Sequence, residues 1–251
     1  MNGMIVELRR RGDQIVSPSE EFNGVENRLL AALPRDEYAY LAPMLKAVDF
    51  PKNRVLCEAG SSMRHATFIE RGVASVLVLA ENGLTIEVGT VGNEGFVGVP
   101  IILGADIAPY RVMSQTRIEA LRINMDSLRG ELNRHGKLQE TLLRYANVLQ
   151  TQTLQALVCK HFHSPEQRLS RQLLATSDSL KADILDVTQE QIGSMLTVHR
   201  NRVSVAVRAL QKSGLIECSR RRIRILDRDG LKAIACECYG IVKECIGALE
   251  T

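Results

Sequence analysis

The chain has 251 residues, of which 45% are hydrophobic, and a formal net charge of +3. This length and apolar content suffice for one large domain or two ordinary ones and exclude a mainly disordered chain. The net charge is too small to indicate a nucleic-acid partner by itself, but residues 164–228 hold twelve Lys and Arg against seven Asp and Glu, so the basic excess lies in the C-terminal part.

The N-terminal segment carries no recognisable targeting signal. Its first thirty residues lack the apolar run of a secretory signal and the composition of a transit peptide, and no stretch of about eighteen apolar residues occurs in the chain. We therefore expect a cytoplasmic protein without a membrane partner. Six cysteines scattered through such a chain do not indicate a disulfide framework.

Residues 52–123 have the pattern of an all-β unit. Short β-type runs alternate with glycines, and these runs cover residues 67–70, 74–79, 85–88 and 117–123. Strands of this length at regular spacing are typical of a small barrel or roll. Asn82 and Gly83 predict a hairpin turn, because both residues tolerate a positive φ.

Residues 138–161 contain neither Pro nor Gly and predict a long helix. One apolar line on this helix lies near the a and d positions of a coiled-coil seam. We assign its residues to a dimer helix, and they are Leu142, Tyr145, Leu149 and Ala156. A second apolar line follows Leu143, Ala146 and Leu157, so one side of the helix can cover the β unit while the other meets a second copy of the chain. The alternative is a core helix that packs only within its own chain.

The composition turns helical and basic after residue 163. Ser164 or Pro165 can open the next helix, since Pro is tolerated at the first helical position. We therefore place a domain boundary at residues 162–165.

Residues 187–210 predict a helix-turn-helix. Thr188 can cap the first helix, in which Ile192 and Leu196 lie four residues apart on one buried side. A short turn at residues 196–198 leads to the second helix. The apolar face of that helix consists of Val203, Ala206, Val207 and Leu210.

The opposite face of the second helix carries the side chains that we expect to contact DNA. A helix in the major groove reads bases with its N-terminal residues, and Arg suits a bidentate contact with guanine as Asn does with adenine. The predicted contacts are His199, Arg200, Asn201, Arg202, Ser204 and Arg208.

Residues 214–225 predict two short strands around a tight, basic connection. Arg220, Arg221, Arg222 and Arg224 lie within five positions. Such a run is usually a solvated surface when it stands alone. Beside a helix-turn-helix it favours a wing, in which Arg220, Arg221 and Arg222 bind phosphates or enter the minor groove.

With these motifs the chain resembles the Crp/Fnr superfamily of bacterial regulators over nearly its whole length. The glycine-punctuated segment from Gly60 to Gly98 is similar to the cyclic-nucleotide-type β-roll of that family, and the order β-roll, long helix, winged helix-turn-helix is the same. The resemblance implies an α+β fold with an N-terminal β-roll (a cyclic-nucleotide-binding-like jelly roll) at 1–136, a dimerisation helix at 137–163 and a DNA-binding domain with a C-terminal helix at 164–251.

The resemblance also implies a homodimeric transcription regulator that binds double-stranded DNA, with RNA polymerase and an unidentified small-molecule effector as further candidate partners. Arg200 matches a base-reading Arg of the family. Asn201 stands where Glu is usual, and Val205 stands where cyclic-AMP-type members have a second Arg. We therefore expect an operator that differs from the usual half-site of the family.

The resemblance also covers the effector pocket of the family, but this pocket is degenerate here because its ligand-binding residues are replaced. Cyclic-AMP-binding members use a Gly-Glu pair and a later Arg-Ser, which correspond here to Gly98-Val99 and to the region of Ala108 and Pro109, with Arg111 displaced. Without these groups a cyclic phosphate is poorly held, so cyclic AMP is not expected to bind. No cysteine precedes Cys57, so the iron–sulfur cluster of the oxygen-sensing branch is not expected either.

Other chemistry is weakly indicated. Cys236, Cys238 and Cys245 do not have the spacing of a zinc ribbon or finger, and we interpret them as half-buried thiols. His161 and His163, near Cys159, are interpreted as helix-end caps. No metal ligand, cofactor or enzyme active site is expected.

Two alternatives to DNA binding remain open. One is a metal- or thiol-responsive sensor that uses the C-terminal cysteines. The other is a small-molecule-binding module that acts through protein contacts.

Overall fold

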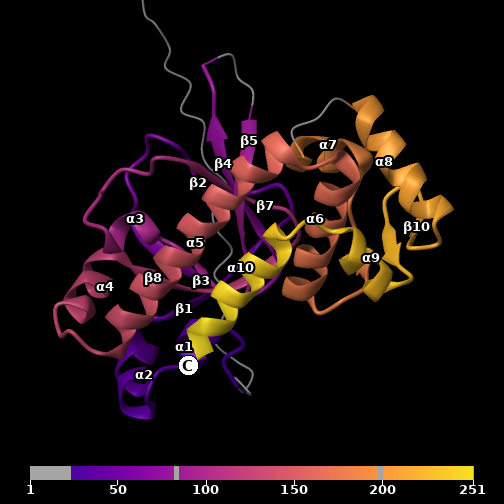
Figure 1. The fold of residues 1–251 in the computed structure, drawn as a ribbon. Helices are drawn as coiled ribbons and strands as arrows, with labels where there is room; N and C mark the ends of the chain where they lie inside the picture. Colours follow the sequence, from indigo (N-terminus) through magenta and orange to yellow (C-terminus); the bar gives the residue numbers. More distant parts are fainter. Residues whose placement is uncertain (1–23, 82–84, 197–199, 251) are drawn as a thin grey trace, which may run out of the picture.

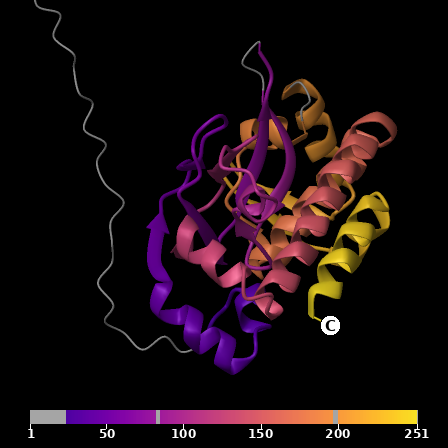
Figure 2. The ribbon, with the colours of Figure 1, turned by 90° about the vertical axis from the view of Figure 1, so that its left-hand side faces the viewer.

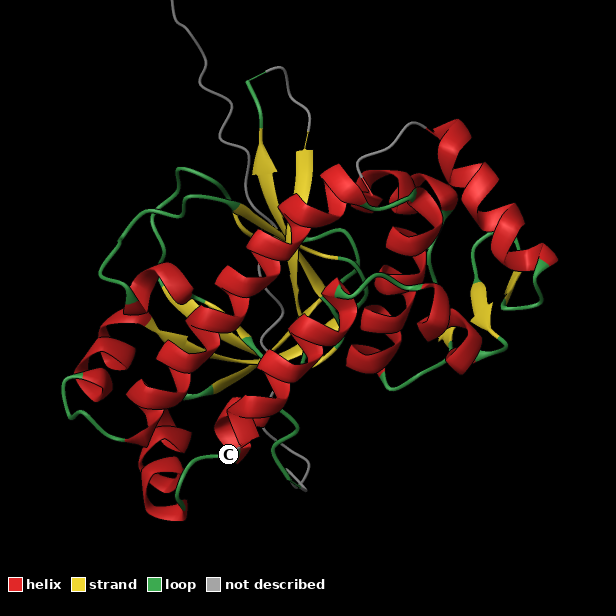
Figure 3. Cartoon of the chain, viewed as in Figure 1, coloured by secondary structure: helices red, strands yellow, loops and turns green. Residues whose placement is uncertain are grey.

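The computed structural model describes residues 24–81, 85–196 and 200–250, with the side chains of residues 189–190, 194–195, 200–201 and 250 outside the description. It is an α+β fold in the predicted order, with an N-terminal β-roll, a long helix and a C-terminal helix-turn-helix unit (Figure 1). Figure 3 shows the strands of the β-roll gathered at the centre and a separate, smaller sheet in the C-terminal unit.

The β-roll consists of two four-stranded sheets in which every pairing is antiparallel. The first sheet has the order β1 (Lys46–Phe50), β8 (Ile118–Asn124), β3 (His65–Arg71), β6 (Phe96–Val97). The second has the order β2 (Val55–Cys57), β7 (Arg111–Ser114), β4 (Ala74–Leu79), β5 (Thr85–Val91). The four predicted runs correspond to β3, β4, β5 and β8.

Glycine shapes the turn between β3 and β4. Gly72 has a φ of +96°, and a Cβ at this position would lie 2.2 Å from the carbonyl oxygen of Arg117. Only glycine meets both requirements without strain. The hairpin turn predicted at Asn82 and Gly83 falls outside the described residues.

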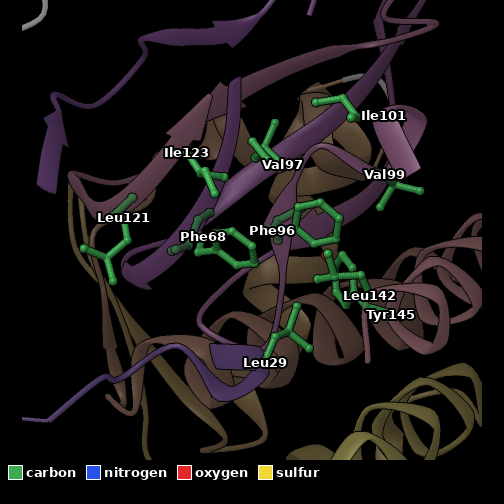
Figure 4. Close-up of a cluster of buried hydrophobic side chains, with 14 of the residues drawn as sticks. Leu29, Phe68, Phe96, Val97, Val99, Ile101, Leu121, Ile123, Leu142 and Tyr145 are labelled. Atoms are coloured by element: carbon green, nitrogen blue, oxygen red, sulfur yellow. The ribbon is translucent and has the colours of Figure 1, made fainter. Parts of the chain in front are cut away.

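The core of the β-roll is closed by the long helix. Phe68 and Phe96 stack with their ring centroids 5.3 Å apart, and the ring of Tyr145 lies 5.5 Å from that of Phe96. Figure 4 shows these rings within a cluster of aliphatic side chains that includes Leu29 and Leu142. Burial of this apolar surface is the main force that holds the helix on the sheets.

Short helices close the ends of the β-roll. They are α1 (Arg28–Ala31), α2 (Arg35–Leu41), α3 (Val99–Ile102) and α4 (Met125–Leu132), with a 3-10 turn η1 (Ala42–Met44) after α2. Asn27 caps α1 and is completely buried, and its amide donates 2.8 Å hydrogen bonds to the carbonyl oxygens of Ile69 and Gly95. The cap therefore fixes α1 onto the roll.

Helix α5 (Lys137–Phe162) is the predicted long helix, but its buried face corrects the predicted dimer seam. Leu142, Tyr145 and Leu149 lie in the core of their own chain and are at most 7% exposed, while Ala156 is half-buried. The apolar residues that α5 leaves exposed are Leu143, Leu154, Leu157 and Phe162.

The C-terminal unit has its own core around α6 (Pro165–Leu180), α7 (Gln189–Leu196), α8 (Arg200–Lys212) and α9 (Arg228–Ile234). Its small sheet has the order β10 (Ile216–Cys218), β11 (Ile223–Ile225), β9 (Ile184–Leu185). Ser164 opens α6 with Pro165 at the first helical position, as predicted, and forms a capping box with Gln167.

The last helix, α10 (Cys238–Gly247), returns along α5 (Figures 1 and 2). The 3-10 turn η2 (Ala248–Glu250) follows it, and Leu249 joins the core of the β-roll with 7% of its surface exposed. The segment after α9 thus packs on the N-terminal part of the molecule. Within the described ranges, none of the helices has the length and apolar content needed to cross a membrane.

Candidate nucleic-acid interface

The first helix of the predicted helix-turn-helix is capped as expected. The backbone N–H of Gln191 donates to Thr188 Oγ1 at 3.2 Å, and the backbone N–H of Thr188 donates to Gln191 Oε1 at 3.0 Å. This reciprocal pair satisfies two helix-end donors of α7. Ile192 and Leu196 are buried in the C-terminal core.

Helix α8 buries its predicted apolar face. Val203, Ala206, Val207 and Leu210 are each no more than 1% exposed. On the opposite face Arg202 and Arg208 are exposed, Ser204 is half-buried and Val205 is 58% exposed. Figure 1 places α8 at the edge of the molecule, beyond α6 and α7 from the β-roll, so its cationic face lies toward solvent.

The residues predicted to read bases cluster where α8 begins. Arg200 and Asn201 form the first turn of the helix by their backbone, and their side chains lie outside the description. His199 falls outside the described residues. Arg208 donates from Nε to the carbonyl oxygen of Ser204 at 3.1 Å, within its own helix.

The predicted wing is a β-hairpin, formed by β10 and β11. Its connection is closed by a 2.8 Å hydrogen bond from the backbone N–H of Ser219 to the carbonyl oxygen of Arg222. Arg220 and Arg221 are exposed, and Arg222 forms a 2.8 Å ion pair with Asp186 in the segment before α7. The hairpin thus presents its arginines beside the helix-turn-helix.

Polar contacts fix the C-terminal unit against the β-roll. Lys52 donates from Nζ to the carbonyl oxygen of Asp186 at 2.9 Å. Gln172 of α6 donates to Glu87 Oε1 at 3.0 Å. Glu87 is buried and also accepts from Ser75 at 2.7 Å and Gln115 at 2.8 Å. Its burial raises the pKa of the Glu87 carboxyl, although these hydrogen bonds and the charge of the nearby Arg171 oppose the shift.

The residues of the degenerate effector pocket have separate structural roles. Gly98 has a φ of +154° before α3, and Val99 is buried in the β-roll core. Arg111 pairs with Glu58 at 2.9 Å, and this hydrogen bond lowers the pKa of the Glu58 carboxyl. The Arg111 guanidinium is therefore already occupied by a carboxylate.

A separate cavity of about 320 Å³ lies between the two units, where β5, α5, α6 and α10 meet. Charged groups on its wall include Glu94 from the β-roll, Arg171 from α6 and Lys243 from α10. This cavity was not predictable from the sequence, because its wall comes from segments that only the fold brings together.

Four side chains that the sequence analysis did not connect converge at the end of α5. One donor atom each from Cys159, His163, Cys236 and Cys238 lies within 4.8 Å of the others. We call this set the cysteine–histidine cluster. The expectation of half-buried thiols is wrong for Cys236 and Cys238, which are 3% and 0% exposed.

The remaining cysteine and histidine of this region lie outside the cluster. Cys245 Sγ is 3.7 Å from Thr151 Oγ1 on α5. His161 contacts the carbonyl oxygen of Leu157 at 2.9 Å through Nδ1, which is the predicted capping role. The cluster was not predictable from spacing, because Cys159 and Cys236 are 77 positions apart.

Comparisons with known proteins cover both units. A cyclic nucleotide-binding domain model matches residues 47–135, and a Crp-like helix-turn-helix domain model matches residues 167–234. A CRP-like cAMP-activated global transcriptional regulator of Mycobacterium tuberculosis is 23% identical over 226 residues, which are 87% of this chain and 97% of that protein.

Solved structures with the same fold include two bacterial regulators. One is a Crp/Fnr-family transcriptional regulator from Eubacterium rectale, with a TM-score of 0.65, 16% identity, and coverage of 82% of this chain and 96% of that one. The other is the c-di-GMP-responsive global regulator CLP from Xanthomonas campestris, with a TM-score of 0.62, 15% identity, and coverage of 76% and 99%.

Proposed function

Because the chain belongs to the Crp/Fnr superfamily of transcription regulators, we propose that it binds duplex DNA as a homodimer, with α8 of each subunit in a major groove. The observation that carries this proposal is the division of α8 into a buried apolar face and an exposed face with Arg202 and Arg208. A helix anchored in this way can enter a groove without unfolding its own core.

The wing supplies sequence-independent affinity in this proposal. Arg220 and Arg221 are exposed on a hairpin directly after α8. Guanidinium groups in this place bind phosphates and fix the register of the helix on the duplex, whereas the start of α8 reads bases.

The proposed dimer uses the exposed line of α5. Leu143 and Leu157 are separated by two heptads on the same side of the helix, with Leu154 beside them, and their exposed fractions are 45%, 54% and 54%. Apolar residues in such a line are suited to pairing with an equivalent helix. The predicted seam through Leu142 and Tyr145 is replaced by this one, because the β-roll already covers those side chains.

We further propose that cyclic AMP is not the effector, although the M. tuberculosis relative is described as cAMP-activated. Val99 places a buried aliphatic side chain where that ligand requires a carboxylate, and Arg111 is paired with Glu58. The cavity between the two units is better placed for a small molecule to influence both.

The experiment is a gel-shift titration on an operator selected from random duplexes. Arg200→Ala should lose specific affinity and relax the base preference, by about 1–3 kcal/mol for one bidentate contact. Added cyclic AMP should leave the affinity unchanged. Arg129→Ala, which removes an equal charge on α4, is the control and should bind as the parent does. Equal affinity of both variants would contradict the role of α8.

A further inference from the structure

We propose that the cysteine–histidine cluster binds one Zn²⁺ ion, with Cys159, His163, Cys236 and Cys238 as its four ligands. Three thiolates and one imidazole form a recurrent ligand set of structural zinc sites. The cluster offers one donor atom per residue, and three of its four members are buried. A buried, closed set of four ligands favours a structural role over a catalytic one, which would need an open position.

The distances fit a tetrahedral ion. Zn–S bonds of about 2.3 Å place the sulfurs of a regular tetrahedron about 3.8 Å apart. Cys159 Sγ and Cys236 Sγ are 3.3 Å apart, Cys238 Sγ and His163 Nδ1 are 3.7 Å apart, and no pair in the cluster exceeds 4.8 Å. Small shifts of the side chains therefore suffice to centre an ion among them.

The imidazole is oriented as metal-bound histidines are. Its Nδ1 faces the cysteines, and its Nε2 lies 3.1 Å from Glu237 Oε1. In metal sites a carboxylate commonly accepts the N–H of the second ring nitrogen and so fixes the tautomer that leaves the first nitrogen as the ligand. Glu237 is thus a positioning residue for His163.

A cationic side chain lies near the cluster. Zinc with three thiolates carries a net charge of −1, and Arg171 of α6 lines the same cavity as Cys238. Within the described residues, the Nε of Arg171 is buried without a hydrogen-bond partner. A nearby anionic site compensates for the burial of this guanidinium. Zinc binding displaces the remaining thiol protons to solvent.

The three sulfur donors of the cluster also limit which metal ion it can bind. Mg²⁺, Ca²⁺ and Mn²⁺ prefer oxygen ligands, whereas tetrahedral sites of sulfur and nitrogen favour zinc. The cluster is therefore not a site for a hard cation.

The position of the ion would join two parts of the molecule. Cys159 and His163 lie at the end of α5, while Cys236 lies between α9 and α10 and Cys238 begins α10. Beside the cluster, Arg168 of α6 donates to the carbonyl oxygen of Leu196 at the end of α7. Zinc would thus fix the helix-turn-helix unit relative to the proposed dimer helix. This effect on DNA binding rests on the proposed function, but binding of the ion does not.

The test measures metal in the full chain after purification without chelator. Elemental analysis should give about one zinc per chain. Replacement of zinc by Co²⁺ should give the intense visible bands of tetrahedral cobalt and the near-ultraviolet charge-transfer bands of thiolate ligands. Cys236→Ser should lose most of the zinc and weaken the thiolate bands.

Matched variants identify the ligands. Cys245→Ser and His161→Ala alter the nearest residues of the same types outside the cluster, and both should keep full zinc and unchanged cobalt spectra. Glu237→Gln should retain zinc but weaken its affinity by about 10-fold to 100-fold in competition with a chelator. Circular dichroism of each variant separates loss of metal from loss of fold.

Several results would overturn the proposal. One is parent protein that lacks stoichiometric zinc, or that holds iron and sulfide instead of zinc. Another is a deficit of two thiols in the denatured chain, which would indicate a disulfide. A third is loss of zinc in Cys245→Ser. Parent protein that is purified without zinc and still binds its operator would overturn the zinc site and leave the DNA-binding proposal intact.

Discussion

The arginines of the wing differ in what they contact, and this decides how each can serve DNA. Arg222 is ion-paired with Asp186, but both side chains are about two-thirds exposed. Exposed ion pairs contribute little to stability, so a phosphate can replace Asp186 at small cost. Arg220 and Arg221 are exposed on the same connection.

Replacement of Arg220, Arg221 and Arg222 by Ala should therefore weaken binding to all duplexes alike. The slope of log affinity against log salt should become shallower by about one unit per lost phosphate contact. Fluorescence anisotropy on operator and random duplexes over a series of salt concentrations checks this. A loss confined to the operator would assign base reading to the wing.

Glu87 links pH to stability at the contact between the units. Burial raises its folded pKa above the ordinary value of 4.5, so the folded state holds the proton more tightly than the unfolded state does. The stability from this group is fully present below the ordinary value and is lost as pH rises through the folded pKa.

In Glu87→Gln the pH dependence of stability that this carboxyl causes should disappear. The free energy of unfolding of the variant should therefore rise relative to that of the parent as pH rises from acid to neutral. Urea unfolding at several pH values gives the difference. Glu81→Gln, at an exposed carboxyl, should differ from the parent by a constant amount. A constant difference for Glu87→Gln as well would contradict the raised pKa.

Among the elements, α5 has a covered face and an open one, and the open face makes the dimer testable. Leu143→Glu with Leu157→Glu should convert a dimer to a monomer in sedimentation analysis and lower operator affinity by about 100-fold or more, because the second half-site no longer adds to the first. Leu103→Glu changes a leucine that is 64% exposed outside α5 and should leave the dimer intact. An unchanged dimer in the double variant would place the interface elsewhere.

The elements with strong local patterns were predictable, and those defined by distant partners were not. The capped helices α6 and α7, the apolar face of α8 and the hairpin after it follow from residues close in sequence. Strands β1, β2, β6 and β7 were missed, since they have two to five residues and pair with strands far along the chain. Periodicity found both apolar lines of α5 but could not tell which one the β-roll covers.

At the scale of the whole molecule, α10 ties the two cores together. The cysteine–histidine cluster lies at the start of this helix, and Leu249, just after the helix, is buried in the core of the β-roll. Neither relation could be foreseen, because both depend on the chain returning to α5. The two units should therefore unfold together.

Leu249→Ala should lower the free energy of unfolding by about 2–3 kcal/mol, since a buried leucine leaves a cavity when truncated. Leu226→Ala, at a leucine that is 54% exposed, is the control and should stay near the parent. Chemical unfolding followed by near-ultraviolet and far-ultraviolet circular dichroism checks the size of the effect and whether both signals move as one. Equal effects of the two substitutions would show that η2 adds no core contact.

The burial of Val99 bears on any attempt to redesign this protein into a cyclic-nucleotide receptor. Restoring the family carboxylate by Val99→Glu would insert a charge into the apolar core of the β-roll, where Val99 is 6% exposed. Arg111 would remain held by Glu58. An engineered receptor would need smaller side chains in the interior of the roll to make room for the ligand, so replacing single residues by those of the family motif is the wrong strategy for this scaffold.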